Sequence, residues 1–173
     1  PDYRGLFNLT HNLGAEIALF QRLVEWGLPH LVVAGTCLEY GLQFGPLAED
    51  AETRPNTPYG LAKDTVRKTL QLMQKTQPFT LQWMRLFYMY GPGQSERSLL
   101  SQLDKALAEK RPSFDMSPGD QLRDYLPIEE VAERFARVIM RPDVSGVINC
   151  CSGRPTSVFD LVDRHLRANS GSI

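Results

Sequence analysis

The chain has 173 residues, of which 42% are hydrophobic and 23% charged, the composition of a globular domain with a full core. Nineteen basic and twenty acidic residues leave a net charge of −1, which provides no basic field for nucleic acid or an anionic membrane. No apolar run reaches the roughly 18–20 residues that cross a bilayer. We therefore expect neither nucleic acid nor a membrane as partner.

The three cysteines are Cys37, Cys150 and Cys151. An odd number with two adjacent members does not suggest a disulfide framework, and no Cys/His spacing suits zinc. We expect reduced thiols in the cytoplasm, no metal site, and Cys150 and Cys151 as small buried hydrophobes of a strand.

The first half of the chain alternates helical and extended patterns. Apolar residues three or four apart predict a helix over 8–27 that ends at Gly27, and the run 30–35 reads as a buried strand. After a loop over 41–57, Thr57 as N-cap and Pro58 at the first position start a helix that reaches about residue 76. The segment 79–91 follows as a strand and its exit loop.

The second half, after "GPGQ" (91–94), is less regular. We predict the following elements: a helix over 96–109, short extended pieces near 113–116 and 122–125, a helix over 128–140, a strand over 146–151 and a helix from about residue 158. Helices that alternate with such apolar strands indicate an α/β fold with a parallel sheet. In such sheets function collects at the carboxyl ends of the strands, where "GTCLEYG" and "YMYGPG" lie.

Tyr59 and Lys63 share a helix face because residues four apart are neighbours there. A cation this close stabilises the tyrosinate and lowers the pKa of the phenol from about 10 towards neutrality, which suits an acid/base at cellular pH. Thr36, at the end of its strand, offers a hydroxyl for a substrate oxygen. The alternative is a packing tyrosine, a solvated lysine and a hydroxyl bonded to its own backbone.

Five motifs occur in this order: "VVAGTCLEYG", "PNTPYGLAK", "RLFYMYGPGQ", "GDQLRDYLPIEEVA" and "GVINCCSG". Together they resemble the signatures of extended short-chain dehydrogenase/reductases, the NAD-dependent epimerase/dehydratase family that acts on nucleotide sugars. The resemblance runs from about Asn12 to Leu166. It implies a Rossmann-type, doubly wound parallel sheet, present here as its second part, and a small C-terminal α/β substrate lobe.

The resemblance implies roles for the residues that match the motifs. Tyr59 would exchange a proton with a sugar oxygen that Thr36 polarises, and Lys63 would bind the nicotinamide ribose and lower the Tyr59 pKa. Phe87 and Tyr88 would lie on the cofactor side.

Substrate contacts are implied for Thr36, Cys37, Tyr88 and Arg123, and the Arg123 guanidinium suits a diphosphate. Four further residues are expected to be structural: Asn12 as a helix kink or a holder of a water, Asp124 as a loop or strand partner, and Asn149 and Gly153 in the substrate lobe.

Three departures from the family pattern limit the prediction. The glycine-rich G-x-x-G-x-x-G loop is absent, so we expect a piece of a longer protein that lacks the first half of the Rossmann domain. Residues 1–94 would be the rest of that domain and 95–173 mainly the substrate lobe, with some return to the sheet. This piece by itself is expected to bind NAD poorly and to be inactive.

The other two departures concern the substrate. Cys37 and Leu38 stand where 4,6-dehydratases have Asp-Glu, and Glu39 has the wrong spacing to replace them, so dehydration is disfavoured. Tyr88 stands where many members have an Asn that touches the substrate phosphates. It either stacks on the ligand or packs under its loop.

The resemblance thus implies NAD(P)-dependent oxidoreduction at a nucleotide-sugar carbon, C4 by preference, as an epimerase or a 4-keto reductase. NAD is preferred over NADP, and polysaccharide biosynthesis is the family's usual setting. The alternative is a catalytically idle NAD(P)-binding sensor or scaffold. A homodimer through the helices near 8–26 and 58–76 is expected, with Leu19, Trp26, Leu72 and Met73 as its surface.

Overall fold

The structure, a computed structural model, describes residues 2–170, which divide into two compact units. Unit 1 comprises the chain up to residue 87 together with residues 133–150. Unit 2 comprises residues 88–132 and those from 151 onward. Residues 133–150 carry the third strand of unit 1.

A three-stranded parallel sheet forms the centre of unit 1. Its strands are β1 (His30–Thr36), β2 (Thr80–Leu86) and β6 (Gly146–Cys150), in the order β1-β2-β6. Thr36 lies opposite Leu86, and Leu86 lies opposite Cys150, so the three strands end level with one another. The predicted α/β class with a parallel sheet is therefore confirmed.

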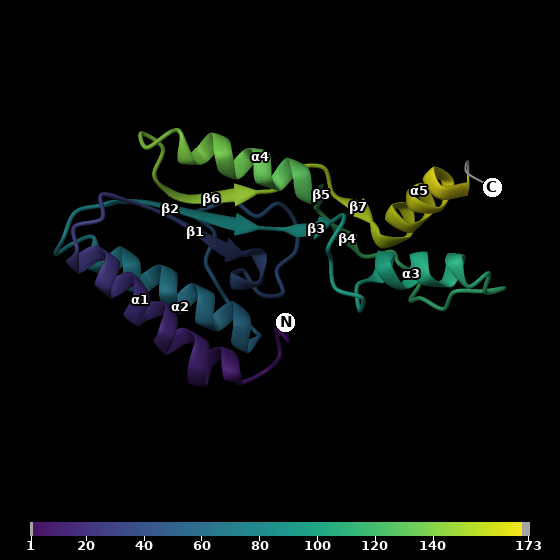
Figure 1. The fold of residues 1–173 in the computed structure, drawn as a ribbon, viewed down its shortest axis with the longest axis horizontal. Helices are drawn as coiled ribbons and strands as arrows, with labels where there is room; N and C mark the ends of the chain where they lie inside the picture. Colours follow the sequence, from purple (N-terminus) through teal and green to yellow (C-terminus); the bar gives the residue numbers. More distant parts are fainter. Residues whose placement is uncertain (1, 171–173) are drawn as a thin grey trace. The chain divides into compact units, whose positions relative to one another are not determined.

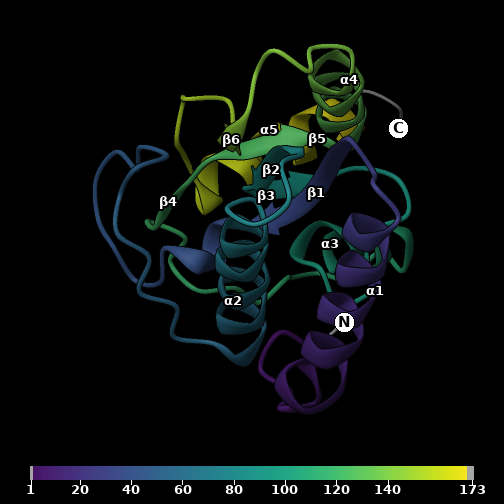
Figure 2. The ribbon, with the colours of Figure 1, turned by 90° about the vertical axis from the view of Figure 1, so that its left-hand side faces the viewer.

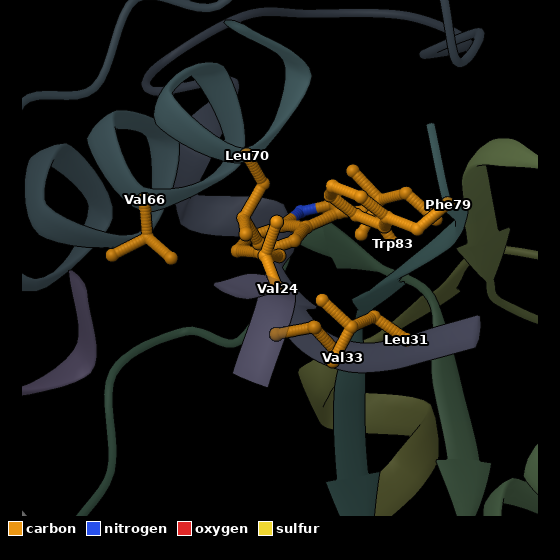
Figure 3. Packing of buried hydrophobic residues seen from close by; sticks show 8 residues of the cluster. Val24, Leu31, Val33, Val66, Leu70, Phe79 and Trp83 are labelled. Atoms are coloured by element: carbon orange, nitrogen blue, oxygen red, sulfur yellow. The ribbon is translucent and has the colours of Figure 1, made fainter. Parts of the chain in front are cut away.

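Helices cover both faces of this sheet (Figures 1 and 2). On one face lie α1 (Leu13–Glu25) and α2 (Pro58–Met73), and on the other lies α4 (Ile128–Ile139), whose residues from Glu133 onward belong to unit 1. Figure 3 shows the core under α1 and α2, where both helices meet the two longer strands. The buried members of this core are Val24, Leu31, Val33, Val66, Leu70, Phe79, Leu81 and Trp83.

Helix α2 begins as the sequence predicts. The Thr57 side chain accepts a hydrogen bond from the Gly60 amide (3.1 Å), and Pro58 occupies the first helical position, where its missing N–H costs nothing. The helix ends at Met73, three residues before the predicted end.

The first turns of the predicted 8–27 helix are a π-helix, η1 (Asn8–Asn12), which continues into α1. The buried Asn8 side chain donates to the carbonyls of Asp2 (2.8 Å) and Gly5 (2.9 Å), and Asn12 donates to Asn8 Oδ1 (3.2 Å). Asn12 therefore stands at the junction of two helix types, consistent with the predicted irregularity there.

Unit 2 holds two small sheets and two helices. Strand β3 (Tyr88–Tyr90) pairs in parallel with β5 (Tyr125–Pro127), and β4 (Leu122–Arg123) pairs antiparallel with β7 (Thr156–Ser157). Helices α3 (Leu99–Ala108) and α5 (Val158–Ser170) pack through Leu100, Leu103, Leu161 and Val162.

Three details of unit 2 differ from the sequence prediction. Residues 88–90 form a strand instead of an exit loop, residues 113–116 form no strand, and β7 was not predicted. All three concern segments of two to four residues, whose pairing depends on distant partners and not on local pattern.

No helix among residues 2–170 is long and apolar enough to cross a membrane. In the same part of the chain, no group of three or more His, Cys, Asp or Glu side chains is arranged to hold a metal ion.

Candidate active site

Thr36 ends β1 and caps the short 3-10 helix η2 (Cys37–Glu39). Its hydroxyl accepts from the Leu38 amide (3.3 Å), while its own amide donates to Glu39 Oε1 (2.9 Å), so the two residues form a reciprocal capping box. The Thr36 hydroxyl is thus bonded to its own backbone, as one reading of the sequence predicted. Because it accepts in that bond, its hydrogen is left to donate to a second oxygen.

Glu39 is the central buried charge of this turn. Its side chain has 0% exposure and accepts from the Thr36 amide, from Trp83 Nε1 (2.9 Å) and from Arg85 Nε (2.8 Å). Arg67 Nε lies 3.5 Å from Glu39 Oε2 but makes no hydrogen bond. The carboxylate therefore anchors the Thr36 turn to the middle strand of the sheet.

Tyr59 lies in the first turn of α2, and the start of this helix presses on the Thr36 turn. A Cβ atom on Gly60 would stand 2.5 Å from the Leu38 carbonyl oxygen, a distance that only glycine permits. The Tyr59 amide donates to the Tyr3 carbonyl (3.2 Å). Main-chain contacts on both sides thus fix the position of Tyr59 relative to η2.

Lys63 is held by a residue that the sequence analysis did not single out. Its Nζ donates to both carboxylate oxygens of Glu16 on α1, at 3.0 and 3.1 Å. The two side chains retain 15% and 33% exposure respectively. The ammonium is therefore partly shielded and has a counter-charge of its own.

This pairing changes the electrostatics predicted for Tyr59. Burial raises the pKa of Tyr59 above its ordinary value of 10.0, and the negative charges of Glu16, Glu39 and Cys37 raise it further. The pKa of Tyr59 is therefore raised in this structure and not lowered as predicted, chiefly because the phenol is buried and secondarily because of the Glu16 charge.

The loop after η2 is tied to the sheet through Tyr40 and Asn149. Tyr40 is fully buried, its ring covers the Arg85 guanidinium at 4.3 Å, and its hydroxyl donates to Asn149 Oδ1 (2.8 Å). Asn149 in turn donates to the Leu47 carbonyl (2.8 Å). The Phe87 ring lies 6.3 Å from that of Tyr40, so it belongs to the same packed end of the sheet.

In unit 2, Arg123 and Tyr88 are brought together. The Arg123 guanidinium lies 5.4 Å from the centre of the Tyr88 ring, and the Tyr88 and Tyr125 rings are 5.6 Å apart. Asp124, beside Arg123, accepts from the amides of Ser152 (2.6 Å) and Gly153 (2.7 Å). Asp124 is therefore a loop partner, as predicted, and the aromatic side chain supports the guanidinium.

The predicted residues thus fall into two groups. Unit 1 holds Thr36, Cys37, Tyr59, Lys63 and Phe87, and unit 2 holds Tyr88 and Arg123. A hydroxyl at a strand end, a tyrosine and a lysine one turn along the next helix define a Rossmann-type domain of the short-chain dehydrogenase/reductase kind.

Comparison with known proteins identifies the family. The family described as "NAD dependent epimerase/dehydratase family" matches residues 7–151, and the chain belongs to this family.

The chain is similar to several proteins whose activity is named. It is 30% identical over 145 residues to dTDP-6-deoxy-L-talose 4-dehydrogenase (NAD(+)) of Aggregatibacter actinomycetemcomitans, covering 83% of this chain and 53% of that protein. It is 29% identical to dTDP-L-rhamnose 4-epimerase of Burkholderia thailandensis, covering 72% and 36%. Among solved structures, MoeE5 in complex with UDP-glucose and NAD superimposes with a TM-score of 0.83 at 26% identity, covering 98% and 60%. The chain thus spans 53% of the length of the dehydrogenase and 36% of the length of the epimerase.

Two residues of the site were missed or set aside by the sequence analysis. Glu39 lacks the spacing of a dehydratase acid, but Thr36-x-x-Glu39 is the sequence pattern of a capping box, which does indicate its role. Glu16 carries no comparable signal. It is one acidic residue in a helix, and its partner Lys63 lies 47 residues away.

Proposed function

We propose that the protein catalyses NAD-dependent oxidoreduction at C4 of a nucleotide-diphosphate sugar, as a 4-epimerase or a 4-keto reductase. The observation that carries the proposal is the contact of α2 with η2. It brings the start of α2, which carries Tyr59, against the turn that bears Thr36, and Lys63 follows one helical turn later.

The chemistry of these donors fits the nicotinamide end of NAD. A partly exposed ammonium and a phenol on one helix face can both donate to ribose hydroxyls. When bound, NAD would supply the hydride acceptor or donor for the sugar carbon. The chain's 173 residues contain no G-x-x-G-x-x-G loop for the pyrophosphate, so the assigned residues concern only the nicotinamide half.

Each residue has a defined task in this proposal. Tyr59 gives its proton to the C4 oxygen when a ketone is reduced and takes it back when the alcohol is oxidised. Thr36 donates its hydroxyl hydrogen to the same oxygen, and Lys63 holds the ribose. Arg123, supported by Tyr88, binds the diphosphate with its guanidinium fork.

The choice of C4 and of a nucleotide sugar rests on the relatives. The two curated proteins described above are a 4-dehydrogenase and a 4-epimerase of dTDP-sugars, and the solved neighbour holds UDP-glucose with NAD. Dehydration is disfavoured because it needs carboxylates after Thr36. Cys37 and Leu38 stand there instead, and Glu39 is fully buried with its oxygens already engaged.

One experiment separates epimerase from reductase. The full-length protein is incubated with a UDP- or dTDP-hexose and no added reduced cofactor. A C4-inverted product without net formation of NADH supports the epimerase. Turnover only with a 4-keto sugar and reduced cofactor supports the reductase.

Tyr59→Phe tests whether the protein is an enzyme at all. We expect turnover to fall at least 100-fold, the lower end of what a positioned acid/base contributes, with the circular dichroism spectrum retained. Unchanged turnover would refute the role of Tyr59. No turnover in the wild type, with intact NAD binding, would favour the idle sensor or scaffold.

The proposal includes a cytoplasmic homodimer. Three large apolar side chains are exposed on this part of unit 1: Leu19 on α1 (56%), Trp26 just after α1 (78%) and Leu72 on α2 (62%). We propose them as the dimer surface. Met73, predicted to share it, packs against the core of unit 1 instead, so its inclusion was wrong. Gel filtration of the full-length protein with Trp26→Ser or Leu72→Ser tests this surface.

A further inference from the structure

The contact between Glu16 and Lys63 joins two helices of unit 1. Lys63 Nζ donates to both carboxylate oxygens of Glu16, at 3.0 and 3.1 Å, so the ammonium is held by two bonds from one group. Such a paired contact defines where the ammonium stands more closely than a single bond does. Because both side chains are partly buried, solvent screens their attraction less than it would at an open surface.

The other charged groups around α2 have partners of their own. On α1, Arg22 pairs with Glu25. His11 of η1 contacts the Thr10 hydroxyl, His30 of β1 contacts Gln82, and Arg85 of β2 pairs with Glu39 of η2. Within α2 itself, Asp64 binds Arg67 and Lys68. Among residues 2–170, the charges that raise the pKa of Tyr59 are those of Glu16, Glu39 and Cys37 of η2. Glu16 is therefore the group positioned to offset Lys63.

We propose that Glu16 is a positioning residue of this site: its carboxylate fixes the Lys63 ammonium and offsets the charge that Lys63 would otherwise present to Tyr59. This inference rests on the proposed function, in which Tyr59 exchanges the proton. It assigns to α1 a direct part in the chemistry of α2.

The consequence is a preferred direction of proton transfer. A tyrosine without a net positive neighbour keeps its proton at neutral pH, which suits donation to a ketone oxygen. An unopposed lysine would favour the tyrosinate, which suits removal of a proton from an alcohol. Glu16 thus prepares Tyr59 to donate its proton, the state that reduction of a keto sugar requires.

The first test follows the ionisation of Tyr59 and needs no turnover. Near-ultraviolet absorbance is titrated against pH in the full-length protein and in Tyr59→Phe, and the difference reports Tyr59. The same difference is measured in a Glu16→Gln background. We expect the Tyr59 titration to move to lower pH in Glu16→Gln. It should stay in place in Glu25→Gln, a matched control on the same helix whose carboxylate pairs with Arg22. An unmoved titration in Glu16→Gln overturns the inference.

A second variant shows whether the effect runs through Lys63. When Lys63→Met is added to Glu16→Gln, the unopposed charge is removed and the Tyr59 titration should return to higher pH. A titration that stays low in the double variant contradicts the inference, since Glu16 would then act without Lys63.

The third measurement separates this inference from the proposed function. In the reductive direction, we expect wild-type activity to fall as pH rises and Tyr59 loses its proton. Glu16→Gln should lose activity at lower pH, in step with its titration. An unchanged profile despite a shifted titration would show that Tyr59 is not the proton donor. In that case the proposed function fails while the electrostatic role of Glu16 stands.

Discussion

The buried pair of Glu39 and Arg85 allows a prediction whose size follows from the contacts. Glu39→Gln preserves the shape of the side chain but removes its charge. The guanidinium of Arg85, only 1% exposed, then faces an amide instead of a carboxylate. Removing one partner of a buried pair costs about 3–5 kcal/mol, because the remaining charge is left in a low-dielectric site.

Other contacts of the substituted side chain and of Arg85 reduce this loss of stability only in part. Gln can still accept from the Thr36 amide and Trp83 Nε1 through one oxygen, and Arg85 keeps its contact with the Tyr40 ring at 4.3 Å. Arg85 Nε nevertheless loses the charged acceptor to which it donates in the wild type. We therefore expect Glu39→Gln to lower the free energy of unfolding by about 3–5 kcal/mol, a large part of the roughly 5–15 kcal/mol of a typical domain.

The assay is urea unfolding followed by tryptophan fluorescence, to which Trp83 beside Glu39 contributes. Arg85→Met in the Glu39→Gln background removes the unpaired cation, so the double variant should be more stable than Glu39→Gln alone. Glu133→Gln is the matched control. Its i,i+4 pair with Arg137 is 65% and 77% exposed, and its loss should cost under about 0.5 kcal/mol. The reasoning would be refuted if Glu39→Gln lowered the free energy of unfolding as little as Glu133→Gln does. It would also be refuted if the effects of Glu39→Gln and Arg85→Met on that free energy were strictly additive.

Two further predictions concern stability and are measured by the same unfolding assay. Gly35→Ala places a Cβ 2.2 Å from Trp83 Nε1 and 2.6 Å from Glu39 Oε1 and should cost about 1–3 kcal/mol. Gly14→Ala, with no atom within 4 Å, should be neutral or stabilising by up to about 1 kcal/mol; equal effects would contradict the crowding argument. Burial by itself would raise the pKa of Asp64, but hydrogen bonds from Lys68 and Arg67 outweigh it and hold the pKa below 3.8. The carboxylate's contribution to stability is therefore complete above that unfolded-state value and is lost as pH falls through the lower, folded value. The stability difference between wild type and Asp64→Asn should stay constant from neutral pH to about pH 5 and shrink below about pH 4, and a pH-independent difference would argue against the ion pair.

The sequence predicted the parts of the fold that depend on local pattern. The helical spacing of apolar residues before Gly27, the Thr57–Pro58 start of α2 and the apolar runs of β1 and β2 each reflect interactions within a few residues. The short strands of unit 2 could not be predicted in the same way, because β3 exists only through pairing with β5, more than thirty residues away.

The candidate site shows the same division. The spacing of four residues between Tyr59 and Lys63 predicts that both lie on one face of a helix. The charge that Lys63 presents depends on Glu16, however, and the anchoring of Thr36 depends on Arg85 and Trp83. Such contacts arise only when helices and strands pack. A motif in one element therefore identifies the reactive groups but not their protonation.

The close approach of Gly60 to the Leu38 carbonyl has a consequence for how such a site can diversify. At Gly60 the helix lies against the main chain of the turn, at the Leu38 carbonyl. The separation between the Thr36 turn and the Tyr59 helix is thus a property of the main chain. We expect that exchanges at positions 37 and 38 that leave the main chain in place preserve this close approach.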